Sequence, residues 1–324
     1  MTGAGGRPAG GTTTAAEVVT VTPNPALDWS LSVPGFTAGA VNRVEAETTT
    51  PAGKGVNVAA ALAGAGHRVA ATGWLGADNA AAFEDFFAAR GIEDRFVRVA
   101  GTTRVGIKIT DPSLQRTTDV NFAGRSPTAA DRVALMDRVL GLAGTSPTGT
   151  PGWFVMAGSL PPGVDPGFYC ELATLVVAAG ARVALDTSDE PLRRAIKSEP
   201  HVLKPNVHEL ETLVGAPLPS RAAIVAAARG LLKGETELVA VSMGADGALF
   251  VESGRVVSAT PPRVRVRTTV GAGDAMMAGI VSGRLRRLDL AELARLASGF
   301  ALEAVTGKAA GEWLGEVVVE PVDG

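Results

Sequence analysis

The segment Thr268–Asp274 places two glycines and an acidic residue in front of an apolar, helix-like stretch. Gly271 and Gly273 let the backbone turn sharply, so that successive N–H groups point into one concavity. These unpaired groups and the dipole of the following helix favour a negatively charged group such as phosphate. Asp274, beside them, can accept the proton of an alcohol, so the segment suits phosphoryl transfer to a hydroxyl. The simpler alternative is that Asp274 only caps the helix.

A second polar cluster, Lys204–Glu209, follows a strand-like segment. Asn206 and Glu209 are three residues apart, on one face of a starting helix. An amide and a carboxylate placed in this way can hold a hydrated magnesium ion, which favours one or two carboxylates plus substrate phosphates. The same spacing also fits a helix-capping pair, and the two interpretations are compatible.

Two glycine-rich loops complete the candidates for chemistry. Ser242–Gly247 follows a strand, where ligands of open α/β sheets collect, although a plain β-turn explains it equally well. Ala52–Asn57 contains a Gly-Lys pair but is not a phosphate-binding Walker A loop, because Gly55 stands where that motif needs Ser or Thr. It predicts a helix-opening loop with polar contacts from Lys54 and Asn57.

The composition restricts the class of protein. The chain has 324 residues, 46% of them hydrophobic, and a net charge of -3, which argues against nucleic acid or an anionic membrane as the main partner. One cysteine excludes an intramolecular disulfide and fits the cytoplasm. No apolar run reaches the roughly 20 residues of a membrane helix. Residues 1–16 lack the pattern of a signal peptide and predict a disordered tail.

Apolar strand-like runs alternate with alanine-rich helical stretches, which predicts a mostly parallel sheet covered by helices on both faces. The expected strands are Val18–Thr22, Val69–Leu75, Trp153–Ala157, Val183–Leu185 and Leu238–Ser242. The expected helices are Val56–Ala65, Ala80–Arg90, Asp131–Leu142, Gly167–Ala179, Arg221–Lys233, Asp274–Arg287 and Asp289–Val305.

Two other groups of strand-like segments alternate polar and apolar residues and have no helices within a group, so the strands of each group should pair antiparallel. The groups are Trp29–Val33 with Val41–Thr49, and Phe96–Val99 with Arg104–Thr110 and Thr117–Phe122. We interpret them as a lid formed by insertions at about residues 28–50 and 95–123 of one domain spanning residues 17–320. The apolar side of this lid is expected to pair with a second copy in a homodimer.

Five of these motifs, in this order, resemble the PfkB branch of the ribokinase-like carbohydrate kinases from about Val18 to Val305. They are Thr22–Asp28, the Gly-Lys-Gly loop with Asn57, Gly158–Pro161, Lys204–Glu209 and Gly271–Asp274. The resemblance implies a ribokinase-like three-layer α/β sandwich with a mostly parallel central sheet and a small discontinuous β-sheet lid. Gly106 departs from the pattern, because many relatives carry a polar residue there.

The resemblance also implies a role for each matching residue. Asp274 would be the catalytic base, and the N–H groups of Gly271, Ala272 and Gly273 would form the anion hole. The substrate would be held by Asp28, Gly53, Lys54, Asn57, Arg104 and Lys108. The ATP site would be lined by Lys204, Asn206, Ser242, Gly244, Gly247, Thr269 and Gly273, and Glu209 would organise Mg²⁺. Arg104 and Lys108 could instead be solvated charges on an edge strand.

The expected reaction is transfer of the γ-phosphoryl group of ATP to fructose 1-phosphate, because the run Thr118–Phe122 is typical of the subgroup acting on this sugar phosphate. Tagatose 6-phosphate and fructose 6-phosphate are the alternative substrates. A catalytically inactive sugar-phosphate sensor is the remote alternative. The resemblance implies Mg²⁺ with ATP and allows a monovalent cation as a further requirement.

Overall fold

The computed structural model describes residues 16–114, 116–144, 152–266, 268 and 270–322. The predicted tail, residues 1–16, therefore lies outside the described residues except for Ala16. Within these ranges no helix combines the length and the apolar character that crossing a membrane requires.

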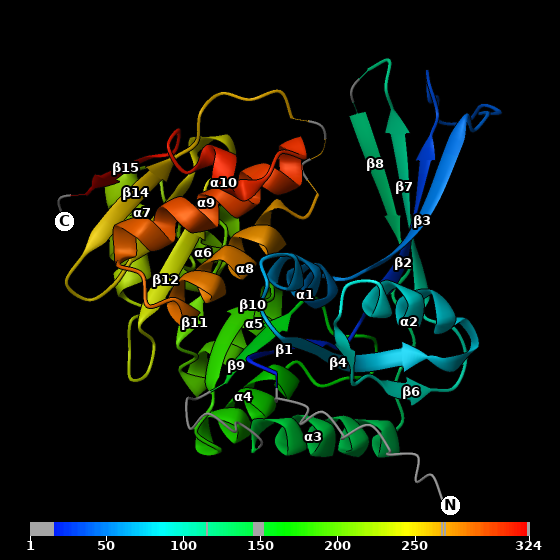
Figure 1. Ribbon diagram of the computed structural model, residues 1–324, viewed down its shortest axis with the longest axis horizontal. Coiled ribbons are helices and arrows are strands. Elements are labelled where there is room, and N and C mark those ends of the chain that lie inside the picture. Colours follow the sequence, from blue (N-terminus) through cyan, green and yellow to red (C-terminus); the bar gives the residue numbers. More distant parts are fainter. Residues whose placement is uncertain (1–15, 115, 145–151, 267, 269, 323–324) are drawn as a thin grey trace, which may run out of the picture.

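A central sheet of eleven strands organises the molecule (Figure 1). Its strands pair in the order β15-β14-β13-β12-β11-β10-β9-β1-β4-β5, and β6 also pairs with β4. The parallel strands are β1 (Val18–Thr22), β4 (Val69–Gly76), β5 (Glu93–Asp94), β6 (Val97–Val99), β9 (Trp153–Ala157), β10 (Arg182–Asp186), β11 (Val202–Leu203) and β12 (Leu238–Ser242). The antiparallel edge consists of β13 (Ala248–Val251), β14 (Val256–Thr260) and β15 (Val318–Pro321). Because β1, β9 and β12 are mostly apolar and almost entirely buried, their predicted bounds agree with the structure.

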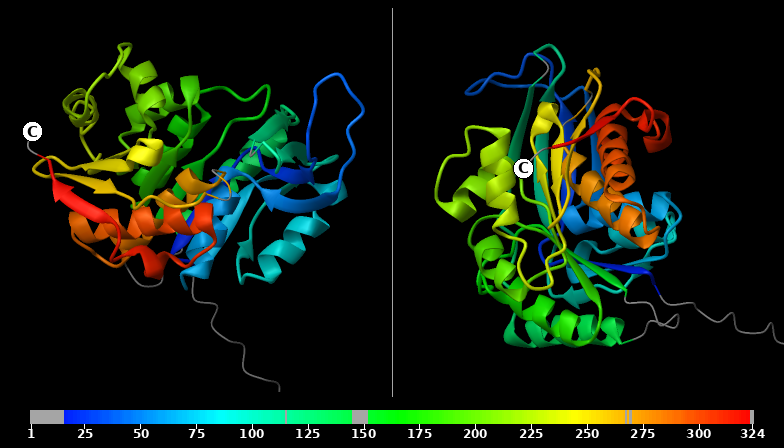
Figure 2. Two further views of the ribbon diagram at one scale, coloured as in Figure 1. Left: turned by 90° about the horizontal axis from the view of Figure 1, so that it is seen from above. Right: turned by 90° about the vertical axis from the view of Figure 1, so that its left-hand side faces the viewer.

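Helices cover both faces of this sheet, and the predicted three-layer α/β architecture is confirmed (Figure 2, right). One layer contains α1 (Lys54–Gly64), α2 (Ala81–Ala88), α8 (Ala272–Leu285), α9 (Leu290–Thr306) and α10 (Ala310–Trp313). The other contains α3 (Ala129–Ala143), α4 (Phe168–Ala178), α5 (Asp189–Ala195), α6 (Val207–Val214) and α7 (Arg221–Arg229). Two separate apolar cores result, one on each side of the sheet.

A second, four-stranded sheet rises from the main body beside α1 (Figure 1). This small sheet consists, in spatial order, of β3 (Ala46–Ala52), β2 (Ala26–Ser32), β7 (Arg104–Asp111) and β8 (Arg116–Asn121). The strands within each insertion, β2–β3 and β7–β8, pair antiparallel as predicted, and the parallel pair β2–β7 joins the two insertions. One detail of the prediction was wrong. Val97–Val99 belongs to the central sheet, because it pairs in parallel with Trp74–Gly76.

Candidate active site

The parallel strands all end at one edge of the central sheet. From β1 the strand order runs outward to β4 on one side and through β9 to β10 on the other, so the topology switches direction between β1 and β9. Ligands of open α/β sheets bind at such a switch point. Here the loops after the two strands touch, because Asn24 Nδ2 donates to Ser159 Oγ at 3.2 Å. Asn24 Nδ2 also donates to the carbonyl of Ala123, just past β8, at 3.1 Å. The switch point is thereby joined to the small sheet.

Asp274 lies in the first turn of α8, next to the glycine turn predicted to form an anion hole. Gly271 caps the helix with φ of 82°, a left-handed conformation that glycine adopts without strain. The Asp274 side chain is buried, and its Oδ2 accepts a hydrogen bond from Asn57 Nδ2 at 2.7 Å. Lys204 approaches the same turn, since a Cβ at Gly273 would lie 3.3 Å from Lys204 Nζ. The carboxylate of Asp274, the backbone N–H groups of the glycine turn and the ammonium group of Lys204 therefore lie close together.

The sequence analysis missed Asp186, which links both lysines of the site. It is the last residue of β10, and its buried carboxylate lies 2.9 Å from Lys54 Nζ through Oδ1 and 2.9 Å from Lys204 Nζ through Oδ2. Burial opposes its ionisation, but Lys204 and Lys54 hold the pKa of Asp186 below its usual value. An acidic residue at the carboxyl end of a buried strand was the signal available in the sequence. Asp186 therefore holds both lysines close to the start of α8.

The same carboxylate acts on Asp274. Burial and, to a lesser extent, the negative charge of Asp186 raise the pKa of Asp274 to about 6. The hydrogen bond from Asn57 and the positive charges of Lys54 and Lys204 act in the opposite direction. A base must be deprotonated to accept a proton, so activity should be retained above this pKa and lost below it. A general base with a pKa near the operating pH is well suited to proton transfer.

Asp186→Asn should therefore move the acidic limb of the kcat/KM profile to lower pH, because it removes a negative charge that raises the pKa of Asp274. A substrate phosphate titrates near pH 6 as well, so the informative quantity is the difference between the variant and the wild type. Profiles of both proteins from pH 4.5 to 8 provide the test. An unchanged or higher midpoint in the variant would contradict the assigned coupling.

The Gly-Lys-Gly loop packs closely against the end of β1. A Cβ at Gly55 would lie 2.3 Å from Thr22 Oγ1, and one at Gly53, whose φ is 126°, would lie 2.9 Å from Thr22 Cγ2. Only glycines allow this approach, which starts α1 and directs Lys54 to Asp186 and Asn57 to Asp274. Both side chains, predicted to bind substrate, lie next to the predicted base.

The polar face of the small sheet carries the other predicted substrate residues. Lys108 Nζ forms an ion pair with Asp28 Oδ2. Arg104 donates from Nε and Nη2 to the carbonyl of Asn24 at 3.4 and 3.2 Å, and from Nη1 to the carbonyl of Phe122 at 3.0 Å. Burial lowers the pKa of Arg104, partly offset by Asp28. Arg104 is half-buried and forms no ion pair with any described residue, so its positive charge is available to a bound anion.

A cleft of about 1180 Å³ separates this face from the main body. Thr110, Thr117 and Asp119 of the small sheet line one side, and Thr268 and Val270 of the loop before α8 line the other. The register places these three strand residues on the same face as Lys108. The polar face of the small sheet is therefore turned towards the loop that leads to Asp274.

Of the predicted ATP residues, Gly273 lies in the first turn of α8, and the others divide into three groups. Asn206, Ser242 and Gly244 line one cavity of about 430 Å³. Lys204 is buried against Asp186 instead, and Gly247 forms a tight turn in which a Cβ would meet the carbonyl of Ala259 at 2.0 Å. Thr269 lies outside the described residues.

Glu209 and Asn206 form the reciprocal capping pair that the sequence allowed. Asn206 N–H donates to Glu209 Oε2, and Glu209 N–H donates to Asn206 Oδ1, each at 2.8 Å. No described residue binds the other carboxylate oxygen of Glu209, and the negative charge of Glu209 contributes to raising the pKa of Lys54. The described residues contain no cluster of three metal-ligating side chains. This donor set fits a hydrated Mg²⁺ held mainly by phosphate, which needs few carboxylates.

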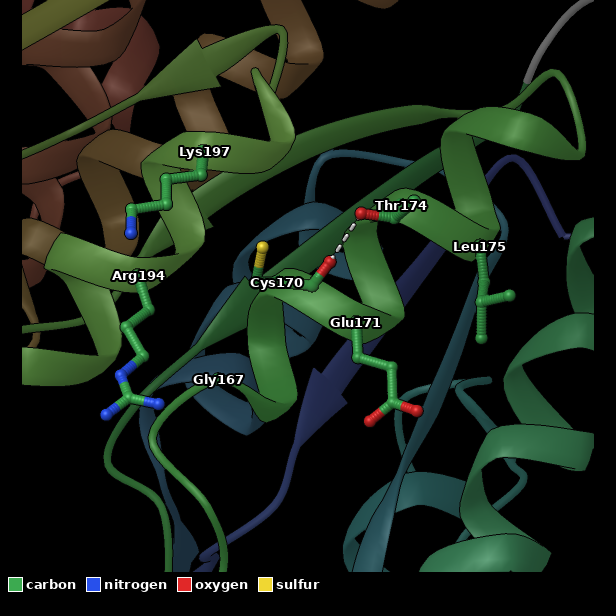
Figure 3. Close-up of a pocket in the computed structure, with 7 residues that line it drawn as sticks. All are labelled: Gly167, Cys170, Glu171, Thr174, Leu175, Arg194 and Lys197. Carbon is green, nitrogen blue, oxygen red and sulfur yellow. Dashed lines mark hydrogen bonds between the residues drawn. The ribbon is translucent and has the colours of Figure 1, made fainter.

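Another cavity, of about 420 Å³, lies outside this site between α4 and α5 (Figure 3). Cys170 and the basic residues Arg194 and Lys197 line it. The cysteine is partly exposed, rather than the fully buried residue its apolar neighbourhood suggests. Arg194 is engaged by Glu190 and Asp165. This cavity contacts none of the predicted catalytic or substrate residues.

Comparison with known proteins assigns the chain to a family. Residues 24–314 match the profile of the pfkB family carbohydrate kinases. The 1-phosphofructokinase of Rhodobacter capsulatus is 46% identical over 288 residues, covering 89% of this chain and 90% of the relative. That of Xanthomonas campestris pv. campestris is 42% identical over 291 residues, covering 88% and 90%. The tetrameric inhibited form of phosphofructokinase-2 from Escherichia coli superposes with a TM-score of 0.86 at 25% identity, covering 93% and 98%.

Proposed function

Because this chain belongs to the pfkB family of carbohydrate kinases, we propose that it transfers the γ-phosphoryl group of ATP to the C6 hydroxyl of fructose 1-phosphate. The observation that carries the proposal is the buried Asp274 carboxylate at the α8 N-terminus, held by Asn57 and flanked by Lys54 and Lys204. The choice of sugar phosphate follows the relatives in Rhodobacter and Xanthomonas, both named 1-phosphofructokinases.

In this mechanism Asp274 accepts the proton of the C6 hydroxyl while that oxygen attacks the γ-phosphorus. The new O–P bond forms as the bond to the β-phosphate oxygen breaks, and ADP leaves with the bonding electrons. The N–H groups of Gly271, Ala272 and Gly273, together with Lys204, stabilise the charge on the transferred group. When bound beside Glu209, Mg²⁺ supplies further neutralisation of phosphate charge. Lys54 and Asn57 orient the acceptor next to Asp274.

The two ends of the sugar phosphate are assigned by distance from Asp274. The reacting hydroxyl must reach this carboxylate, so the existing phosphate lies at the other end of the cleft, towards the small sheet. Arg104, which forms no ion pair with any described residue, supplies one cation on the polar face of this sheet, and Lys108 supplies a second cation now paired with Asp28. Asp28 is then free to accept hydrogen bonds from sugar hydroxyls.

An ADP-release assay with ATP, Mg²⁺ and fructose 1-phosphate separates an enzyme from a sugar-phosphate sensor. We expect ADP to form in proportion to the sugar phosphate consumed. Binding of the sugar phosphate with no ADP release above the ATP-only control would favour the sensor.

We further propose that the apolar face of the small sheet pairs with a second copy. This face carries Leu27, Trp29, Leu31, Val105, Ile107, Ile109 and Val120. Trp29 is 38% exposed and Val120 is 47% exposed. An exposed apolar face of this kind is unusual on the surface of a monomer.

Static light scattering should give the mass of a dimer for the wild type and a lower mass for Val120→Lys, which places a charge in the apolar face. Val133→Lys is the matched control, since Val133 is an exposed valine on α3, 56% accessible. A wild type that is monomeric at assay concentration, or a V120K protein that remains dimeric, would contradict this assembly.

A further inference from the structure

Three residues form a row across the small sheet. The register pairs Asp28 of β2 with Gly106 of β7, and Gly106 with Asn121 of β8. Paired residues of neighbouring strands point to the same face. Asp28 and Asn121 therefore flank Gly106 on the polar face. Their strands, β2 and β8, lie on either side of β7 (Figure 1).

The backbone conformation of Gly106 does not call for glycine, because it is absent from the described residues with positive φ, but the missing side chain leaves room for its neighbours. A Cβ at this position would lie 2.6 Å from Asp28 Oδ1 and 3.1 Å from Asn121 Oδ1. The carboxylate and the amide thus close over the glycine from both sides. Of the Asp28 oxygens, Oδ2 is engaged by Lys108, so Oδ1 is the one directed over Gly106.

Asn121 has the properties of a ligand-binding group. Its side chain is exposed, and no protein hydrogen bond to its amide is found within the described part of the chain. It shares the polar face with Thr117 and Asp119, which line the cleft opposite Thr268 and Val270. An amide offers two donors and an acceptor, and a carboxylate offers acceptors, so the pair suits neighbouring hydroxyls of a sugar.

We propose that Asn121 is a substrate-contacting, specificity-determining residue that binds a ring hydroxyl next to the one held by Asp28, and that Gly106 provides the opening through which both reach the sugar. This inference rests on the proposed function, since it takes the cleft to hold a sugar phosphate. It predicts that Asn121 discriminates between sugar phosphates that differ in the configuration of one hydroxyl.

The test compares Asn121→Ala with Val133→Ala, a control at an exposed position of α3, away from both faces of the small sheet. Steady-state kinetics are measured with fructose 1-phosphate and with its C3, C4 and C5 epimers. A neutral hydrogen bond is worth a few-fold in affinity, so N121A should raise KM for fructose 1-phosphate about 3- to 10-fold. It should leave KM for ATP unchanged, and it should reduce discrimination against one epimer by the same factor. V133A should change none of these quantities.

A second variant tests the opening itself. Gly106→Ala introduces the Cβ that would meet Asp28 and Asn121, so it should raise KM for the sugar phosphate at least as much as N121A. The double variant should raise KM for the sugar phosphate by less than the product of the two single-variant factors, because Gly106→Ala alone already displaces Asn121.

The inference is overturned if N121A matches V133A, or if N121A weakens all epimers equally, as a general structural effect would. Wild-type activity with fructose 1-phosphate is measured first, so that a failure of the proposed function is recognised separately. If that activity is absent, equilibrium binding of fructose 1-phosphate, fructose 6-phosphate and tagatose 6-phosphate decides. N121A must then weaken whichever of them binds, and unchanged binding overturns the inference.

Discussion

Asp274→Asn is expected to reduce kcat by at least about 100-fold, the low end for removing a general base. Asparagine keeps the shape of the side chain but has no carboxylate to accept the hydroxyl proton. Binding of ATP and of the sugar phosphate should be nearly unchanged, because Asn57, Lys54 and the glycine turn remain. Single-turnover rates and equilibrium binding of both substrates provide the measurement.

The neighbouring carboxylate supplies the matched control for this variant. Asp186 is also buried and close to Asp274, but it is neutralised by Lys54 and Lys204 and does not face the acceptor as a base. Asp186→Asn should retain more activity at its optimal pH than D274N. A D274N protein retaining more than a tenth of wild-type kcat would remove Asp274 from its role.

Arg104→Ala should raise KM for the sugar phosphate by about one to two orders of magnitude and leave KM for ATP nearly unchanged. A charge-assisted contact is worth roughly 1.5–3 kcal/mol, and this half-buried guanidinium has no carboxylate partner among the described residues. Arg104→Lys keeps the charge without the planar fork and should give an intermediate effect.

Arg104 also donates to the carbonyls of Asn24 and Phe122, so its removal could act through the backbone. Unphosphorylated fructose separates the two effects. A lost phosphate contact reduces kcat/KM for fructose 1-phosphate and leaves the low value for fructose unchanged. Equal losses for both sugars would show that Arg104 only supports the loop.

The central sheet was predictable because buried parallel strands are continuous apolar runs. Val18–Thr22, Trp153–Ala157 and Leu238–Ser242 have this pattern and form strands with the same bounds. Val97–Val99 was misassigned because its central arginine gives it the alternation of a small-sheet strand. Its partner, β4, is identified only by tertiary packing, which no local pattern encodes.

Parts of the candidate site follow from local motifs, and parts do not. The glycine turn before Asp274 and the Asn206–Glu209 pair each involve residues close together in the sequence. In the structure each of them begins a helix. Asp186 has no motif around it, and its importance comes from two lysines far away in the chain. Gly106 departs from the family pattern. Its neighbours Asp28 and Asn121 come from other strands, so their closeness depends on the register of the small sheet, which no local motif gives.

The measurement that tests the account most directly is kcat/KM for a panel of sugar phosphates, each assayed with ATP and Mg²⁺ for ADP release. The panel contains fructose 1-phosphate, fructose 6-phosphate and tagatose 6-phosphate. We predict the highest kcat/KM for fructose 1-phosphate, with fructose 1,6-bisphosphate as the product. A higher value for either 6-phosphate would contradict the assigned substrate, and no ADP release with any of the three would contradict the kinase itself.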